Sequence, residues 1–383
     1  MLALRLARGA HPLVLLRRLL VATASAGVGF LLLSALTHAL SHPGESSSSL
    51  LRLSWCLIPL AATVQFAVAV ARTDPSTRPR TGLSAVGLGP GRLAVLAAVS
   101  TTLSATLGSM VALLFFLHLR GDLTGLPFDG AAAELLAADQ PLPLAAALIL
   151  LTLAPLTATA AAALALRPRT AEPAPDALPK PPAAPGGLPW GCALTAAGLA
   201  VGTYAARVKG GATVQLPGEL DAHPLGVLLG WALTAVGLAV AGPALTHFCG
   251  RLLQTRRPGG VRLIAGRILM AEARRIGRPL GVLCAVASAA IAAWALYDAG
   301  PGPFGPLTGL GATLVIACTT ATLLTAVTDA RYARSTAVQG LRELGAPAKS
   351  FRLAAGLRTL VLLLVFAPLT WAVATLAAAP LTG

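Results

Sequence analysis

Histidine and aspartate side chains are the first candidates for chemistry in this chain, because together they bind divalent metals. Four histidines and two aspartates lie near the ends of apolar runs: His38, His42, His118, His223, Asp122 and Asp221. None of them falls in a His-Glu-x-x-His pattern or in another tight ligand spacing. The spacing favours solvated histidines at a membrane interface over a metal site, so we expect no metal and no catalytic residue.

ATP chemistry requires a phosphate-binding loop of the form G-x-x-x-x-G-K-[ST]. The chain has three lysines, Lys180, Lys209 and Lys349, and none lies in such a loop. The five cysteines form no CxxC spacing and are typical of small packing residues. We therefore expect no cofactor in this chain, and any ATP that drives it must be bound by a separate subunit.

Two short segments have similar sequences and similar surroundings, because each lies between two apolar runs near basic residues. We call residues 82–90 the first elbow and residues 340–347 the second elbow. In the first elbow, Leu83 and Val86 share one helix face, and Gly87 is a candidate helix end.

The second elbow has the clearer pattern. Val338, Leu341 and Leu344 recur at three-residue spacing and share one helix face, whereas Arg342 and Glu343 point elsewhere. We predict a short helix that Ser335 caps and Gly345 ends, with Pro347 preventing its continuation. A helix of about ten residues is marginal alone. Each elbow therefore needs a membrane surface or a partner to dock against.

The elements that position the elbows are long apolar helices. Apolar residues make up 56% of the chain and charged residues 11%. Runs of roughly 20 apolar residues can cross a bilayer, and in lipid they must be helical. The sequence predicts an all-α transmembrane bundle of about nine spans, ten at most: 19–40, 50–71, 93–118, 141–166, 189–206, 224–247, 279–298, 307–328 and 355–379.

The distribution of basic residues sets the predicted orientation. With a cytoplasmic N-terminus and nine spans, 25 of the 29 Lys and Arg residues fall on the cytoplasmic side. The same distribution accounts for the net charge of +15, which faces anionic lipid and leaves no basic domain for nucleic acid. We expect a multi-pass protein of the plasma membrane with both elbows in the cytoplasm.

Composition divides the chain into four predicted parts. Residues 1–166 form a first four-helix repeat, and the Pro- and Ala-rich residues 167–188 form a cytoplasmic linker. Residues 189–247 form an inserted helix pair, and 248–383 a second repeat whose last helix is missing. Spans one and seven begin alike, with Val21-Ala-Thr-Ala-Ser25-Ala26 against Cys284-Ala-Val-Ala-Ser288-Ala289.

These features resemble a known family. Leu341-Arg342-Glu343-Leu344-Gly345-Ala346-Pro347, with Arg331 and Arg334 upstream and Lys349 downstream, resembles the cytoplasmic signature of FtsX-like ABC transporter permeases. In that family the elbow is the coupling helix that contacts the ATPase. The layout of two repeats around a helix pair is similar to BceB-type members. Two features depart from them: residues 299–306 replace a large external domain, and the final helix is lacking.

The resemblance implies a permease subunit whose partners are two copies of an ABC ATPase and membrane lipid. It would export an amphipathic cargo (lipid, peptide or antibiotic) or transmit force across the membrane. The implied ATPase contacts are Leu83, Val86, Gly87, Leu341, Arg342, Glu343, Leu344 and Gly345. Two alternatives are an ion-coupled secondary transporter, which usually needs an ionisable group in the membrane, and a membrane scaffold that transports nothing.

Overall fold

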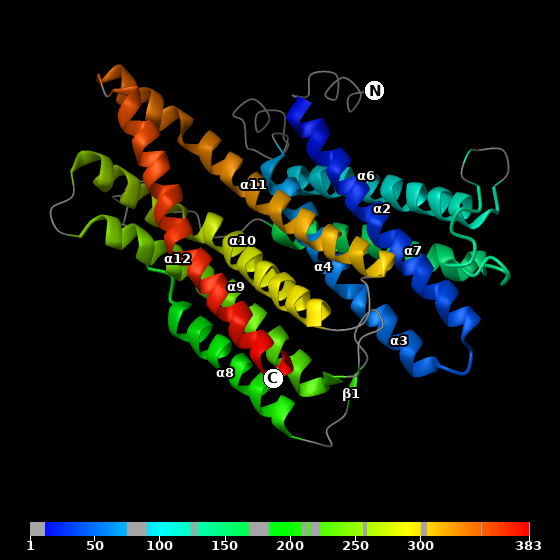
Figure 1. The fold of residues 1–383 in the computed structure, drawn as a ribbon. Coiled ribbons are helices and arrows are strands. Elements are labelled where there is room, and N and C mark those ends of the chain that lie inside the picture. Colours follow the sequence, from blue (N-terminus) through cyan, green and yellow to red (C-terminus); the bar gives the residue numbers. More distant parts are fainter. Residues whose placement is uncertain are drawn as a thin grey trace. The chain divides into compact units, whose positions relative to one another are not determined.

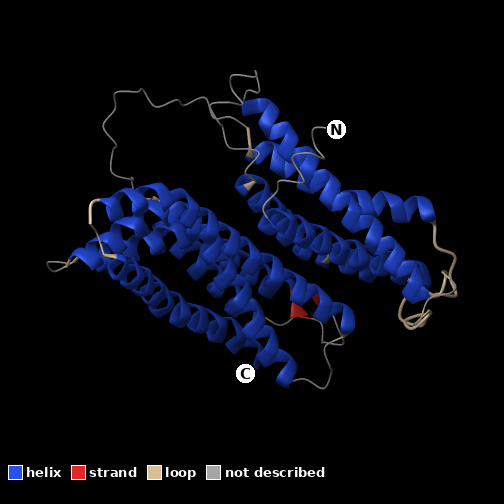
Figure 2. Ribbon diagram, turned by 90° about the horizontal axis from the view of Figure 1, so that it is seen from above, coloured by secondary structure: helices blue, strands red, loops and turns tan. Residues whose placement is uncertain are grey.

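The computed structural model describes residues 12–74, 90–123, 127, 129–167, 184–208, 213–214, 223–255, 259–299, 305–345 and 347–382. Helices make up nearly all of the secondary structure in these residues, beside one pair of two-residue strands (Figure 2). The predicted all-α class is confirmed for this part of the chain.

The chain packs into two units, and the first comprises residues 1–172 and 305–318. Most of its helices are apolar and about as long as a membrane crossing. In a bilayer such segments must be helical, because a helix satisfies its backbone hydrogen bonds internally. The helices are α2 (Pro12–Ser41), α3 (Ser46–Trp55), α4 (Leu57–Thr73), α6 (Pro90–Arg120), α7 (Leu144–Ala165) and the beginning of α11 (Pro306–Glu343) (Figure 1).

The second unit comprises residues 173–304 and 319–383. Its elements are α8 (Leu188–Arg207), β1 (Thr213–Val214), β2 (His223–Pro224), α9 (Leu225–Leu253), α10 (Gly260–Ala299), the remainder of α11, and α12 (Ala348–Thr382) (Figure 1). The two strands pair antiparallel between α8 and α9. The four predicted parts were drawn from composition rather than packing, and their boundaries stay a prediction.

Eight helical segments among the described residues are long and apolar enough to cross a membrane. They match the predicted spans except 189–206, where α8 is helical but does not meet this criterion. The predicted span 50–71 is divided at Cys56 into α3 and α4. The architecture is thus compatible with a multi-pass membrane protein, and the ninth crossing stays a prediction.

In the first unit, α2 and α6 run in the same direction and pack directly together. The hydroxyl of Ser25 donates to the carbonyl of Ala105 at 2.8 Å, and the Phe30 and Phe116 rings meet edge to face at 5.7 Å between centroids. Residue numbers on the two helices rise together along this contact, which makes them parallel. Because α4 lies between them in the chain, it must return in the opposite direction.

In the second unit, α8 and α10 each pack on α9 (Figure 1). Glycines at these contacts let the helices approach closely. A Cβ placed on Gly198 of α8 would lie 2.6 Å from the carbonyl oxygen of Gly230 on α9. A Cβ on Gly277 of α10 would lie 2.8 Å from the carbonyl oxygen of Gly242, also on α9. Small residues drive such contacts between membrane helices. The glycine pairs in 198–202 and 226–230 thus lie at the contact between α8 and α9.

Candidate functional site

The second elbow forms the turn between α11 and α12. Gly345 has φ +91°, in the left-handed region that suits glycine. Its N–H donates to the carbonyl of Arg342 at 2.9 Å, and the N–H of Leu344 donates to that of Gly340 at 3.1 Å. Helices commonly end in this way. The predicted helix end at Gly345 is confirmed, and α12 begins at Ala348, three residues later.

The predicted short elbow helix is wrong, because α11 continues without a break from Pro306 to Glu343. Ser335 does not cap a helix start: its hydroxyl donates to the carbonyl of Tyr332, one turn earlier in the same helix, at 2.7 Å. The physical reason is that residues 329–343 contain no proline and only one glycine. Nothing in this segment stops the helix where its apolar stretch ends.

The tip of the α11–α12 hairpin exposes apolar side chains. Leu344 is 85% exposed and Leu341 is 44% exposed. Arg342 lies over the ring of Phe351 across the turn, with its guanidinium 5.9 Å from the ring centroid. Gln339 donates to the Glu343 carboxylate at 3.3 Å. Two exposed leucines beside polar side chains that contact neighbours make this tip a candidate contact surface.

Behind the tip, a carboxylate on α10 joins three helices. Arg334 of α11 contacts Glu272 at 3.1 Å, and Arg358 of α12 lies 4.0 Å from the same carboxylate. The side chain of Glu272 is 11% exposed, that of Arg358 is 16% exposed and that of Arg334 is 21% exposed. We call these three residues the Glu272 cluster. One charge-assisted hydrogen bond, from Arg334, and one longer ion pair, with Arg358, thus join α10, α11 and α12 at one point.

A second ion pair lies about one turn further along α10. Arg275 contacts Asp329 of α11 at 3.3 Å, with Asp329 17% exposed. Sequence reasoning missed both interactions. A signal was present, since Glu272 is the lone acidic residue among eight arginines in 248–278, and Asp329 falls at the end of a predicted span.

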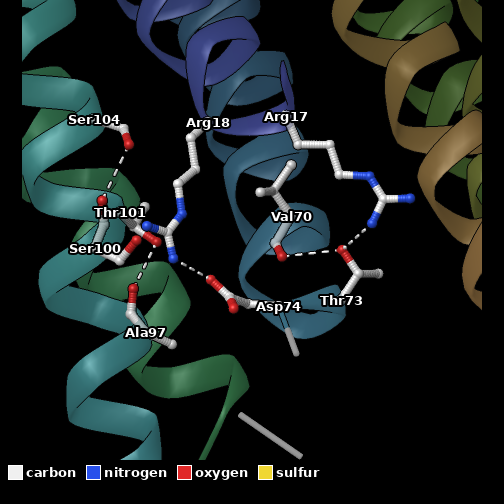
Figure 3. Close-up of polar contacts among 9 residues, drawn as sticks. All are labelled: Arg17, Arg18, Val70, Thr73, Asp74, Ala97, Ser100, Thr101 and Ser104. Carbon is white, nitrogen blue, oxygen red and sulfur yellow. Dashed lines mark hydrogen bonds and ion pairs between the residues drawn. The ribbon is translucent and has the colours of Figure 1, made fainter. Parts of the chain in front are cut away.

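In the first unit, residues 82–89 lie outside the described residues, so the first elbow with Leu83, Val86 and Gly87 stays a prediction. The end of α4 before it is described (Figure 3). Arg18 of α2 forms an ion pair with Asp74 at 2.7 Å, and Asp74 is only 8% exposed. These two residues line a small recess.

Hydroxyl groups on α6 also line this recess (Figure 3). The hydroxyl of Thr101 donates to the carbonyl of Ala97 at 2.9 Å, and that of Ser104 donates to the carbonyl of Ser100 at 3.1 Å. Their protons are used within α6, and the Asp74 carboxylate faces Arg18. Most of these polar groups are paired within the recess, whereas Nε of Arg18 is buried without a hydrogen-bond partner. One such atom does not by itself indicate a ligand.

The histidines do not form a metal centre in the part of the chain that the structure describes. The rings of His38 and His42 stack at 4.3 Å between centroids, and Nε2 of His118 lies 3.0 Å from the carbonyl oxygen of Pro127. No three His, Cys, Asp or Glu side chains among the described residues form a group that could hold a metal ion.

Comparison of the chain with protein-family models, with curated proteins and with solved structures finds no match. The functional argument therefore starts from the contacts above.

Proposed function

We propose that this protein is the membrane permease subunit of an ABC transporter, with the layout of an FtsX-like permease. A separate ATPase, two copies per permease, supplies the energy. The permease exports an amphipathic cargo or transmits force across the plasma membrane. The observation that carries the proposal is the α11–α12 hairpin, which ends in exposed Leu341 and Leu344 and is joined to α10 by ion pairs.

Helix lengths support a projection beyond the membrane. α10 has 40 residues and α11 has 38. At 1.5 Å per residue each is nearly 60 Å long, about twice the hydrocarbon thickness of a bilayer. The basic residues of α10 lie in its first half, residues 260–278. If the basic end of α10 lies in the cytoplasm, the first half of α10 and the second half of α11, next to the second elbow, project into the cytoplasm.

Corresponding contacts in the two units support two pseudo-repeated halves. Ser25 of α2 donates to the carbonyl of Ala105 on α6, 80 positions later. Ser288 of α10 donates to the carbonyl of Thr370 on α12, 82 positions later, at 3.1 Å. In each half a buried serine of the first helix thus joins a third helix that runs parallel to it. The similar sequences around Ser25 and Ser288 match this correspondence.

The carboxylates near the second elbow argue against ion-coupled transport. Glu272 and Asp329 each face arginine, and both lie outside the apolar stretches predicted from the sequence. An ion-coupled transporter usually places an ionisable group near the middle of the membrane. The position and pairing of these carboxylates favour a structural role at the membrane boundary.

Co-purification with the cognate ABC ATPase, encoded beside this gene or identified by crosslinking, tests the proposal. Replacing Leu341 and Leu344 together with Asp should reduce co-purification from detergent at least about tenfold, because placing carboxylates in an apolar pocket carries a large desolvation penalty. Tyr332→Asp is the matched control. Tyr332 is 53% exposed on the same helix but about 13 Å before the first leucine. Undiminished binding by the double variant contradicts the proposal.

A further inference from the structure

The Glu272 cluster lies between the exposed tip and the apolar part of α11. Arg334 precedes Gly345 by 11 positions, a distance of about 16 Å along the helix. Asp329, paired with Arg275, lies about 24 Å from Gly345 at the end of the apolar stretch. A displacement of the tip along α11 must pass both ion pairs before it reaches the apolar helices.

Glu272 attracts Arg334 of α11 and Arg358 of α12 only while its carboxylate is ionised. Arg334 and Arg358 belong to different helices, and the one carboxylate contacts both. Without its charge, two partly buried guanidinium groups would face each other with nothing between them to offset their repulsion. Loss of the Glu272 charge would weaken the attachment of α11 and α12 to α10 without altering Leu341 or Leu344.

The first unit contains a similar pair. Arg18 of its first helix contacts Asp74 at the end of its second helix, and Arg275 of α10 contacts Asp329 of α11. In both cases an arginine on the first helix of a half meets an acid that closes the apolar stretch of the second. A lone surface pair contributes little and needs no explanation. In both pairs the acid is largely shielded from solvent, and its occurrence at matching places in both units indicates a role in the architecture.

We propose that the Glu272 cluster is the positioning element that makes the α11–α12 hairpin move as one body with α10. Resting on the proposed function, this means that the tip binds the ATPase and the cluster passes the movement of the ATPase to the membrane helices. Glu272, Arg334 and Arg358 are positioning residues and make no contact with the partner. Binding and coupling are thereby separate properties of separate residues.

The first test measures binding and coupling in the same complex. Glu272→Gln should leave co-purification of the ATPase within about twofold of the unmodified protein, yet lower the permease-stimulated ATPase rate about tenfold, the scale of a typical coupling between sites. Glu134→Gln, the same change at an exposed position of the first unit, should alter neither. The exchange Glu272→Arg with Arg334→Glu restores opposite charges between α10 and α11 but places a guanidinium at position 272 beside Arg358, so it should recover part of the stimulation.

The second test needs no ATPase. Spin labels at Leu263 on α10 and Tyr332 on α11, 38% and 53% exposed, report the separation of the two helices by pulsed electron paramagnetic resonance. Glu272→Gln should broaden the distance distribution, and the charge exchange should narrow it again. An unchanged distribution overturns the inference, as does normal ATPase stimulation by Glu272→Gln or loss of co-purification. If the unmodified protein binds no ATPase, the proposed function is contradicted. The spin-label measurement still tests whether the Glu272 cluster holds α10 and α11 together.

Discussion

At the residue scale, one glycine determines how the hairpin turns. The structure leaves open space around a Cβ at both Gly340 and Gly345, so a methyl group at either site meets no neighbour. They differ in backbone conformation, because only Gly345 has a positive φ. Gly345→Ala should destabilise the protein by about 1–2 kcal/mol through left-handed strain. Gly340→Ala, inside α11, should be neutral or stabilise it by up to about 1 kcal/mol.

Thermal unfolding of both variants in the same detergent measures this difference. Equal midpoints for the two variants would show that the turn does not require glycine. Gly345 is also the residue that sequence predicted best, because a Gly followed two residues later by Pro is a local signal of a helix end. Glu272 lacks such a signal. Its two partners lie 62 and 86 positions away, so only the packing of three helices reveals its role.

At the element scale, two glycines of α8 differ in how much space α9 leaves for a side chain. A Cβ on Gly198 would contact the Thr234 side chain and the Gly230 carbonyl oxygen, whereas one on Gly202 meets nothing within 4 Å. Gly198→Ala should therefore destabilise the second unit by about 1–3 kcal/mol, the scale of overpacking in a filled interface. Gly202→Ala, on the same helix, should be tolerated. Unfolding in graded sodium dodecyl sulfate checks the pair, and similar curves would contradict the close packing.

The positions of the helices were predictable, but the ends of α10 and α11 were not. Apolar runs locate the crossing segments, because lipid permits no unpaired backbone. Residues 260–278 and 329–343 are basic and amphipathic, and hydropathy gives no sign of their helicity. Neither segment contains a proline that would stop the helix, and in the first of them Ala265 and Leu269 pack with Leu253 of α9 and Ala354 of α12. A helix that depends on such packing cannot be read from its own sequence.

At the scale of the whole molecule, α8 determines on which side of the membrane the later helices end. It has 20 residues but falls outside the eight segments that are apolar enough to cross. Trp190 and Tyr204, near its two ends, are each 73% exposed and about 21 Å apart along the helix. Aromatic side chains are enriched at both membrane interfaces. The close antiparallel packing of α8 on α9, an apolar helix of 29 residues, also favours a crossing.

Single cysteines placed in whole cells decide the crossing. With α8 crossing and the N-terminus in the cytoplasm, Arg207→Cys should react with an impermeant maleimide from outside, because it closes α8 at the outer surface. Leu344→Cys, at the tip of the α11–α12 hairpin, should react only after the cells are opened. Both variants carry Cys192→Ser, since Cys192 is the exposed native cysteine and the other four are buried. Protection of Arg207→Cys in intact cells would mean that α8 does not cross. The second elbow would then lie outside, and Leu344→Cys should react in intact cells.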